Sequence, residues 1–136
     1  MRCSLLCLLL LCAAGTVEAQ AFDEYSGAET FARFCASCHG AAGTGDGPVA
    51  AAIPIPVPDL TRLALRDGQG FSDEVLRKII DGREPVVFHG TRYMPVWGYE
   101  FWVEEGADAE ASERVDTIVR NLVDYIRSIQ QDPLAD

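Results

Sequence analysis

Hydrophobic residues recur at helical spacing in separate stretches of the chain. In GAETFARFC, Gly27, Phe31 and Cys35 follow one another every four residues, which places them along one face of a helix. Near the C-terminus, SERVDTIVRNLVDYIRSIQ shows the same kind of spacing. Its apolar positions are Val115, Ile118, Leu122, Tyr125, Ile126 and Ile129. The glycine in the first stripe indicates that another backbone, that of the last helix, approaches the first helix closely.

A further helix is expected between a residue that favours a helix start and one that favours a helix end. Ser72 is a favourable N-cap for DEVLRKIID and Gly82 is a favourable C-cap, so a helix of about nine residues is predicted there. A shorter helical turn is expected near DLTRLAL. Between the helices, the three prolines of AAIPIPVPD forbid a helix and favour an extended loop. Together these elements predict an all-α domain.

The first nineteen residues differ in character from the rest. After Arg2, the apolar run SLLCLLLLCAAG is too short to cross a bilayer as a helix, and small residues precede position 20 in the manner of a signal-peptidase site. We therefore expect a signal peptide over residues 1–19 and one domain over residues 20–136. An uncleaved membrane anchor is the alternative, and it would leave the chemistry of the domain unchanged.

The charge of the chain narrows its range of partners. The 136 residues carry a formal net charge of -10, and removal of Arg2 and Glu18 with the signal peptide leaves that value unchanged. So acidic a domain argues against nucleic acid and anionic membrane surfaces as partners. The stretch VEEGADAEASE is expected to form an acidic, solvated face that leads into the last helix, with Asp108 or Ser112 as its N-cap.

Two cysteines and a histidine, Cys35, Cys38 and His39, stand close together in FCASCHG. Outside the cytosol such a pair commonly forms a disulfide, but so short a loop constrains the unfolded chain little. A redox-active pair would belong in a βαβ pattern, which the surrounding sequence lacks, and zinc would need a fourth ligand from His89 or a carboxylate. Covalent attachment of haem uses all three residues, because thiols at i and i+3 lie on one helical turn and the histidine follows them as an iron ligand.

The second axial ligand of such an iron decides between electron transfer and the binding of small ligands. Met94 stands before Pro95 in RYMPVWG, a segment that we expect to be a loop without a helical core stripe. We expect Met94 to be this ligand, and His89 is the competing candidate. Haem would also supply an apolar partner for the aromatic residues that crowd the segment after the methionine. These are Trp97, Tyr99, Phe101 and Trp102.

The sequence resembles the class I monohaem c-type cytochromes over nearly all of the expected domain. The likeness is carried by CASCHG, by YMPVWG and by the closing LVDYIRSIQ. It implies a small cytochrome c fold in which several helices surround one covalently attached haem c, with His39 and Met94 as axial ligands. It also implies that Gly27 and Phe31 cross the Leu122 and Tyr125 pair of the last helix. The family's Gly-Pro, whose proline carbonyl accepts the free N–H of the ligating histidine, matches Gly47-Pro48.

These features predict a secreted, periplasmic electron carrier that is not itself an enzyme and has no small-molecule substrate. Its redox protein partners would carry basic docking patches, and it would meet membranes only through respiratory complexes or an uncleaved N-terminus. Three alternatives remain open: a haem c subunit of a larger periplasmic oxidoreductase complex, a ligand-binding or peroxidase-like haem protein, and a thiol-disulfide or zinc protein without haem.

Overall fold

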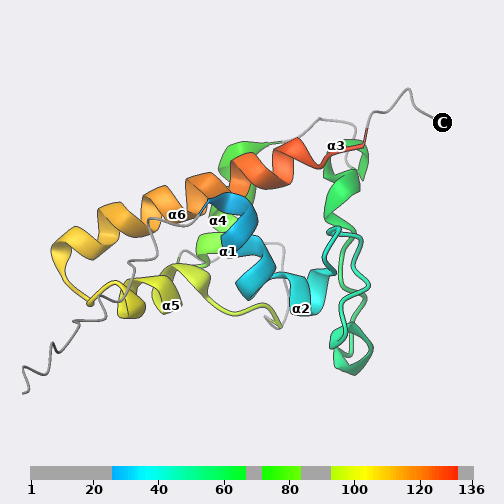
Figure 1. Cartoon of the computed structure of the whole chain (residues 1–136), viewed down its shortest axis with the longest axis horizontal. Helices are drawn as coiled ribbons and strands as arrows, with labels where there is room; N and C mark the ends of the chain where they lie inside the picture. The colour runs from blue at the N-terminus through cyan, green and yellow to red at the C-terminus, as the bar shows by residue number, and fades with distance from the viewer. Residues whose placement is uncertain (1–25, 67–71, 84–92, 132–136) are drawn as a thin grey trace, which may run out of the picture.

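The computed structural model describes residues 26–66, 72–83 and 93–131, and every regular element in these ranges is helical. The helices are α1 (Gly27–Phe34), α2 (Ala36–His39), α3 (Leu63–Arg66), α4 (Asp73–Asp81), α5 (Trp97–Glu104) and α6 (Ala109–Ser128), and 3-10 turns cover Ala50–Ala52 and Leu60–Arg62. The expected all-α class is therefore confirmed (Figure 1). Within the described ranges, no helix combines the length and the hydropathy that crossing a membrane requires. The expected signal peptide lies outside the described residues.

Side-chain caps define where the longer helices begin. Ser72 caps α4 by accepting a hydrogen bond from the Val75 N–H, and Gly82 ends that helix with a left-handed φ of 66°, as expected. For α6 the cap is Asp108, whose side chain accepts from the Ala111 N–H at 2.7 Å. Each cap satisfies a backbone group that the helix itself leaves unpaired.

The crossing of α1 over α6 forms the centre of the fold, and Figure 1 shows α1 lying across the C-terminal half of the long helix. Gly27 faces the backbone of α6, and the ring of Phe31 lies 5.1 Å from that of Tyr125. Phe31 and Leu122 are fully buried between the two helices. The crossing pairs expected from the sequence are therefore confirmed.

Two further helices, α4 and α5, also pack against α6 and complete the core. Leu76 and Ile80 of α4 and Phe101 of α5 are buried against residues of the long helix. The buried residues of α6 recur at helical spacing and are Ala111, Val115, Ile118, Val119, Leu122, Val123 and Ile126. The stripe expected along α6 is thus buried, except that Tyr125 and Ile129 lie at its edge and are half-buried.

The aromatic segment after Met94 differs from its expected form. It was expected to be a loop, but Trp97–Glu104 is the helix α5. Helical spacing brings Trp97 and Phe101 onto one face, where their rings stack at a centroid distance of 5.5 Å. Phe34 of α1 meets both rings edge-on, at 5.7 Å and 5.4 Å. These rings therefore pack against one another as well as against the core. The prediction of a loop did not include this packing.

We expect Gly27→Ala to lower the free energy of unfolding by about 2 kcal/mol. Overpacking costs about 1–3 kcal/mol, which outweighs the gain of about 0.5–1 kcal/mol from replacing a helical glycine. A Cβ at this position would lie 2.6 Å from the Asn121 carbonyl carbon and 2.9 Å from the Tyr125 Cβ. Denaturant unfolding followed by circular dichroism measures the change. Ala28→Ser, on the exposed face of the same helix, serves as the control and should change stability by less than about 0.5 kcal/mol. Equal stability of the two variants would contradict the close crossing.

Candidate functional site

The two cysteines and the histidine lie on one turn of backbone where α1 passes into α2. Cys35 is both the C-cap of α1 and the N-cap of α2. Its carbonyl accepts hydrogen bonds from the backbone N–H groups of Cys38, at 3.1 Å, and of His39, at 2.9 Å. All three residues are half-buried. Because α1 is packed tightly on α6, these bonds give the three side chains a well-defined common position.

Both thiols are free, and their surroundings favour the uncharged form of Cys35. Burial, with a smaller contribution from neighbouring Cys38, raises the pKa of the Cys35 thiol to about 12. Zinc binding and attack on a disulfide both require a thiolate, so this environment favours neither the zinc nor the thiol-disulfide interpretation. Within the described part of the chain, moreover, no three His, Cys, Asp or Glu side chains are grouped in a way that could hold a metal ion.

The imidazole of His39 is oriented by the backbone of a distant residue. Its Nδ1 lies 3.4 Å from the carbonyl oxygen of Pro58. A carbonyl can only accept a hydrogen bond, so Nδ1 carries the proton and Nε2 keeps a free lone pair. Burial lowers the pKa of His39, and the hydrogen bond to Pro58 opposes that shift without cancelling it. The ring is therefore neutral near pH 7 and presents Nε2 as a ligand atom.

The prediction that the Pro48 carbonyl would hold this histidine is wrong. Pro48 is exposed, and the residues on either side of it bond to the backbone of α2. The Gly47 N–H donates to the Cys38 carbonyl and the Val49 N–H donates to the Ser37 carbonyl, both at 3.1 Å. The carbonyl that contacts the His39 ring is that of Pro58, which belongs to the proline-rich segment between the two 3-10 turns.

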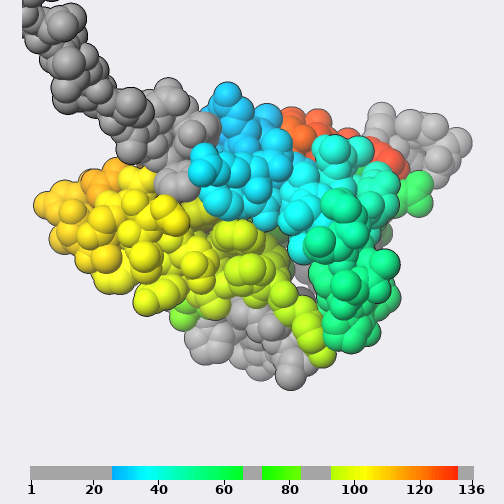
Figure 2. All heavy atoms as spheres, turned by 60° about the horizontal axis from the view of Figure 1, so that its bottom comes forward, coloured from blue at the N-terminus to red at the C-terminus, as the bar shows by residue number. Residues whose placement is uncertain are grey.

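Met94 lies just before α5, where it is partly buried and packs against the core. The ring of Phe34, next to Cys35 in sequence, meets Trp97, three residues after the methionine. This contact brings the segment that carries Met94 alongside the end of α1. In Figures 1 and 2 that segment, yellow-green, extends toward α2 and the green residues that follow it. His89, the competing candidate, lies outside the described residues.

Figure 2 shows the surface hollowed between the cyan and green residues around and after α2 and the yellow-green segment before α5. The candidate ligand atoms, the Nε2 of His39 and the thioether sulfur of Met94, are uncharged, and burial favours the uncharged form of the Cys35 thiol. Their apolar surroundings include Phe34, Ala36 and Trp97, which pack against the core. Nitrogen and thioether donors in an apolar environment suit the iron of a haem, whose ring needs apolar partners, so the residues fit that group.

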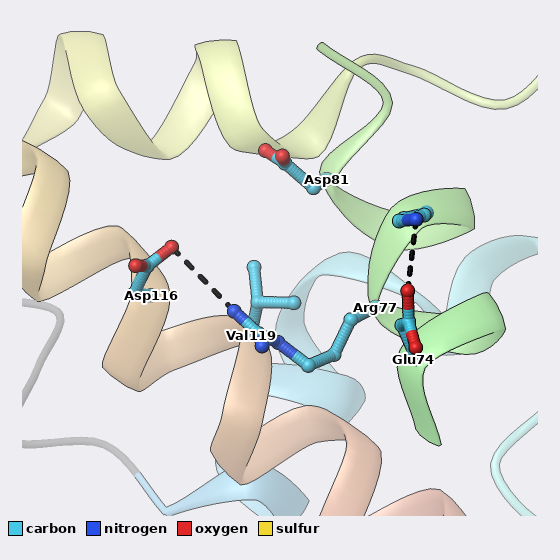
Figure 3. Close-up of a pocket in the computed structure, with 6 residues that line it drawn as sticks. Glu74, Arg77, Asp81, Asp116 and Val119 are labelled. Atoms are coloured by element: carbon cyan, nitrogen blue, oxygen red, sulfur yellow. Dashed lines mark hydrogen bonds and ion pairs between the residues drawn. The ribbon is translucent and has the colours of Figure 1, made fainter. Parts of the chain in front are cut away.

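A second cavity, of about 180 Å³, lies between α4 and α6 and has a different character. Its lining is mostly charged and comprises Glu74, Arg77, Lys78, Asp81, Asp116 and Val119. Figure 3 shows Arg77 reaching from α4 toward Asp116 on α6, with which it forms an ion pair at 3.8 Å. Its volume is below the roughly 300–1,000 Å³ that is typical of small-molecule sites. We therefore interpret it as part of the polar contact between the two helices.

Comparison with known proteins shows that a family model covers most of the chain. The family model described as "Cytochrome C oxidase, cbb3-type, subunit III" matches residues 23–126, which include the cysteine pair, His39 and Met94. No curated protein and no solved structure matches the chain.

Proposed function

The chain belongs to the family described as cytochrome C oxidase, cbb3-type, subunit III, a family of c-type cytochrome domains, and from this membership we propose how and where it carries electrons. Membership makes it a haem c electron-transfer protein rather than an enzyme. We propose that residues 1–19 are a signal peptide and that residues 20–136 form one domain that works in the periplasm. The matched residues lie inside that proposed domain.

The proposed site holds one haem c, attached through thioether bonds to Cys35 and Cys38, with His39 and Met94 as axial ligands. When bound, haem supplies an iron that alternates between the ferric and ferrous states. The observation that best supports the proposal is the hydrogen bond from His39 Nδ1 to the Pro58 carbonyl, because it orients the ring and leaves Nε2 free as a ligand. The apolar side chains of Phe34, next to Cys35, and of Trp97, whose ring contacts that of Phe34, pack against the core and would limit the access of water there.

The proposed attachment predicts a coloured protein of a defined mass. Made in a host with cytochrome-maturation machinery, the mature protein should have the mass of residues 20–136 plus one haem, and a pyridine haemochrome assay should give one haem per chain. The double variant Cys35→Ser with Cys38→Ser should lose all covalently bound haem, because no thiol remains for attachment. Ser37→Ala, an exposed change between the two cysteines, should keep it. A colourless wild-type protein with the mass of the bare chain would overturn the proposal.

Met94 ligation predicts a specific spectroscopic change. Met94→Ala should abolish the weak absorbance band near the red end of the ferric spectrum, and it should lower the reduction potential within the roughly 0.8 V range that axial ligands span. His89→Ala is the matched control and should leave both unchanged. Rapid carbon monoxide binding by the unmodified ferrous protein would contradict Met94 ligation and would favour a ligand-binding or peroxidase-like haem protein.

We propose that redox proteins with basic docking patches are the partners. The distribution of charge indicates which part of this protein would attract them. Residues 100–113 contain six carboxylates and no basic side chain. Glu105 is ion-paired with Arg114 at 2.6 Å, whereas Glu104, Glu110 and Glu113 are exposed. In Figure 1 this turn between α5 and α6 lies at one end of the molecule, and α2 lies well away from it. A basic partner would therefore be attracted first to the α5–α6 turn.

Electron exchange with a basic redox protein should slow as salt is added, because screening weakens the attraction between opposite charges. We expect the rate constant to fall by about 10-fold or more between low and physiological ionic strength. The double variant Glu110→Gln with Glu113→Gln should flatten this dependence, whereas Ser112→Ala, a neutral change at an exposed position between them at the start of α6, should not. A salt-independent rate for the wild-type protein would rule out electrostatic docking.

A second candidate function is that of a haem c subunit within a larger periplasmic oxidoreductase complex. The family description favours it, because that description names an oxidase subunit. Affinity isolation of the full chain from its native host distinguishes the two. Stoichiometric recovery with a larger subunit that resists salt would support the complex, and recovery of the chain alone would support a free carrier.

A further inference from the structure

We propose that Gln130, just beyond the end of α6, is a positioning residue that fixes the Pro58 carbonyl against His39 and thereby tunes the iron-ligating imidazole. This inference rests on the proposed ligation of iron by His39. It assigns a role in the redox centre to a residue far from the cysteine motif in sequence.

Both the nitrogen and the oxygen of the Gln130 side-chain amide form hydrogen bonds. Its Nε2 donates to the Leu60 carbonyl at 2.6 Å and to the Ile126 carbonyl at 2.8 Å. Its Oε1 accepts from the Ala64 N–H at 3.1 Å. One side chain therefore ties the end of α6 to both ends of the segment from Leu60 to Ala64.

The segment held by Gln130 has little freedom to move. Leu60 is buried and its N–H donates to the Gly43 carbonyl at 2.7 Å. The Thr61 carbonyl accepts from the Gln131 N–H at 2.8 Å, and the Thr61 N–H donates to the Asp59 side chain at 2.9 Å. A shift of this turn would break several of these bonds at once, so the turn forms a firm support for the residue that precedes it.

Pro58 lies between this support and His39. Gly45 packs against the same stretch from another side, where a Cβ would come within 2.5 Å of the Val57 carbonyl oxygen and 3.3 Å of that of Pro58. The Gly45 N–H also donates to the His39 carbonyl at 2.8 Å. The Pro58 carbonyl is thus positioned by the Leu60 turn on one side and by Gly45 on the other.

The histidine bond is sensitive to this positioning because it is long. At 3.4 Å, the distance from Nδ1 to the Pro58 oxygen lies beyond the usual range for an N–H···O bond, so a small retreat of the carbonyl would break it. A hydrogen bond donated from Nδ1 makes the imidazole a stronger electron donor and stabilises ferric iron. Loss of the bond should therefore raise the reduction potential.

The test compares neutral variants at adjacent positions in the haem-loaded protein. Gln130→Leu removes the donors to Leu60, whereas Gln131→Leu removes an exposed side chain whose partner is the Arg62 Nε at 2.9 Å. We expect Gln130→Leu to raise the reduction potential and to speed exchange of the His39 Nδ1 proton, measured by NMR of the ferrous protein, roughly tenfold. Gln131→Leu should leave both values at those of the wild-type protein.

A second pair of variants covers the case in which Gln130→Leu fails to fold. Gln130→Glu keeps the acceptor for Ala64 but loses the donors, and Gln131→Glu adds the same charge one residue away. The potential of Gln130→Glu should lie above that of Gln131→Glu, because both carry the added charge and only the first loses the donors. Equal potentials and equal proton exchange within each pair would overturn the inference, even if Gln130 variants melted earlier. A wild-type spectrum without an iron-ligated imidazole would overturn the proposed function as well.

Discussion

The close crossing of α1 over α6 at Gly27 is the contact on which the rest of the structure depends. With eight residues, α1 is too short to be stable by itself, so it owes its order to packing on the long helix. Its far end is Cys35, whose carbonyl holds the backbone of Cys38 and His39. The precision with which the candidate haem-binding residues are placed therefore derives from a contact two helical turns away from them.

The long helix α6 supports the site from two directions. Its C-terminal half receives α1 and so places the cysteines, while the Gln130 side chain and the Gln131 backbone N–H beyond its end hold the turn that follows Pro58. The helix α6 therefore positions both the backbone that carries the His39 side chain and the carbonyl to which its ring is hydrogen-bonded. This arrangement explains how an irregular loop of about twenty residues can position one oxygen atom, since loops of that length have no regular structure of their own to do so.

Local signals were sufficient to predict most of the helices, whereas the contact between distant segments that orients His39 could not be predicted from the sequence. The capping roles of Ser72 and Gly82 depend on only a few neighbouring residues, so the boundaries of α4 could be predicted from them. The buried face of α6 followed from its spacing, and its crossing with α1 was expected from Gly27 and from the family resemblance. The hydrogen-bond partner of His39 could not be predicted in this way. Pro48 and Pro58 both offer a proline carbonyl, and the path of the chain at Leu60 places that of Pro58 beside the ring. The helix α5 was missed because its aromatic residues lacked a recognisable N-cap: its N-cap, Val96, makes no side-chain hydrogen bond.

Few charged side chains lie beside the site, which limits what can set its redox potential. Residues 41–58, which follow α2 and lead to Pro58, contain the single carboxylate Asp46 and no basic side chain, and Asp59 follows Pro58 directly. A larger group of six carboxylates lies in residues 100–113, around the connection between α5 and α6, and screening by solvent weakens its effect on the site. Ligand identity, burial, hydrogen bonding and the two nearby carboxylates then remain as the means of adjusting the proposed iron. Of these, the bond from His39 to Pro58 is the one that the fold can vary by moving a single turn of backbone.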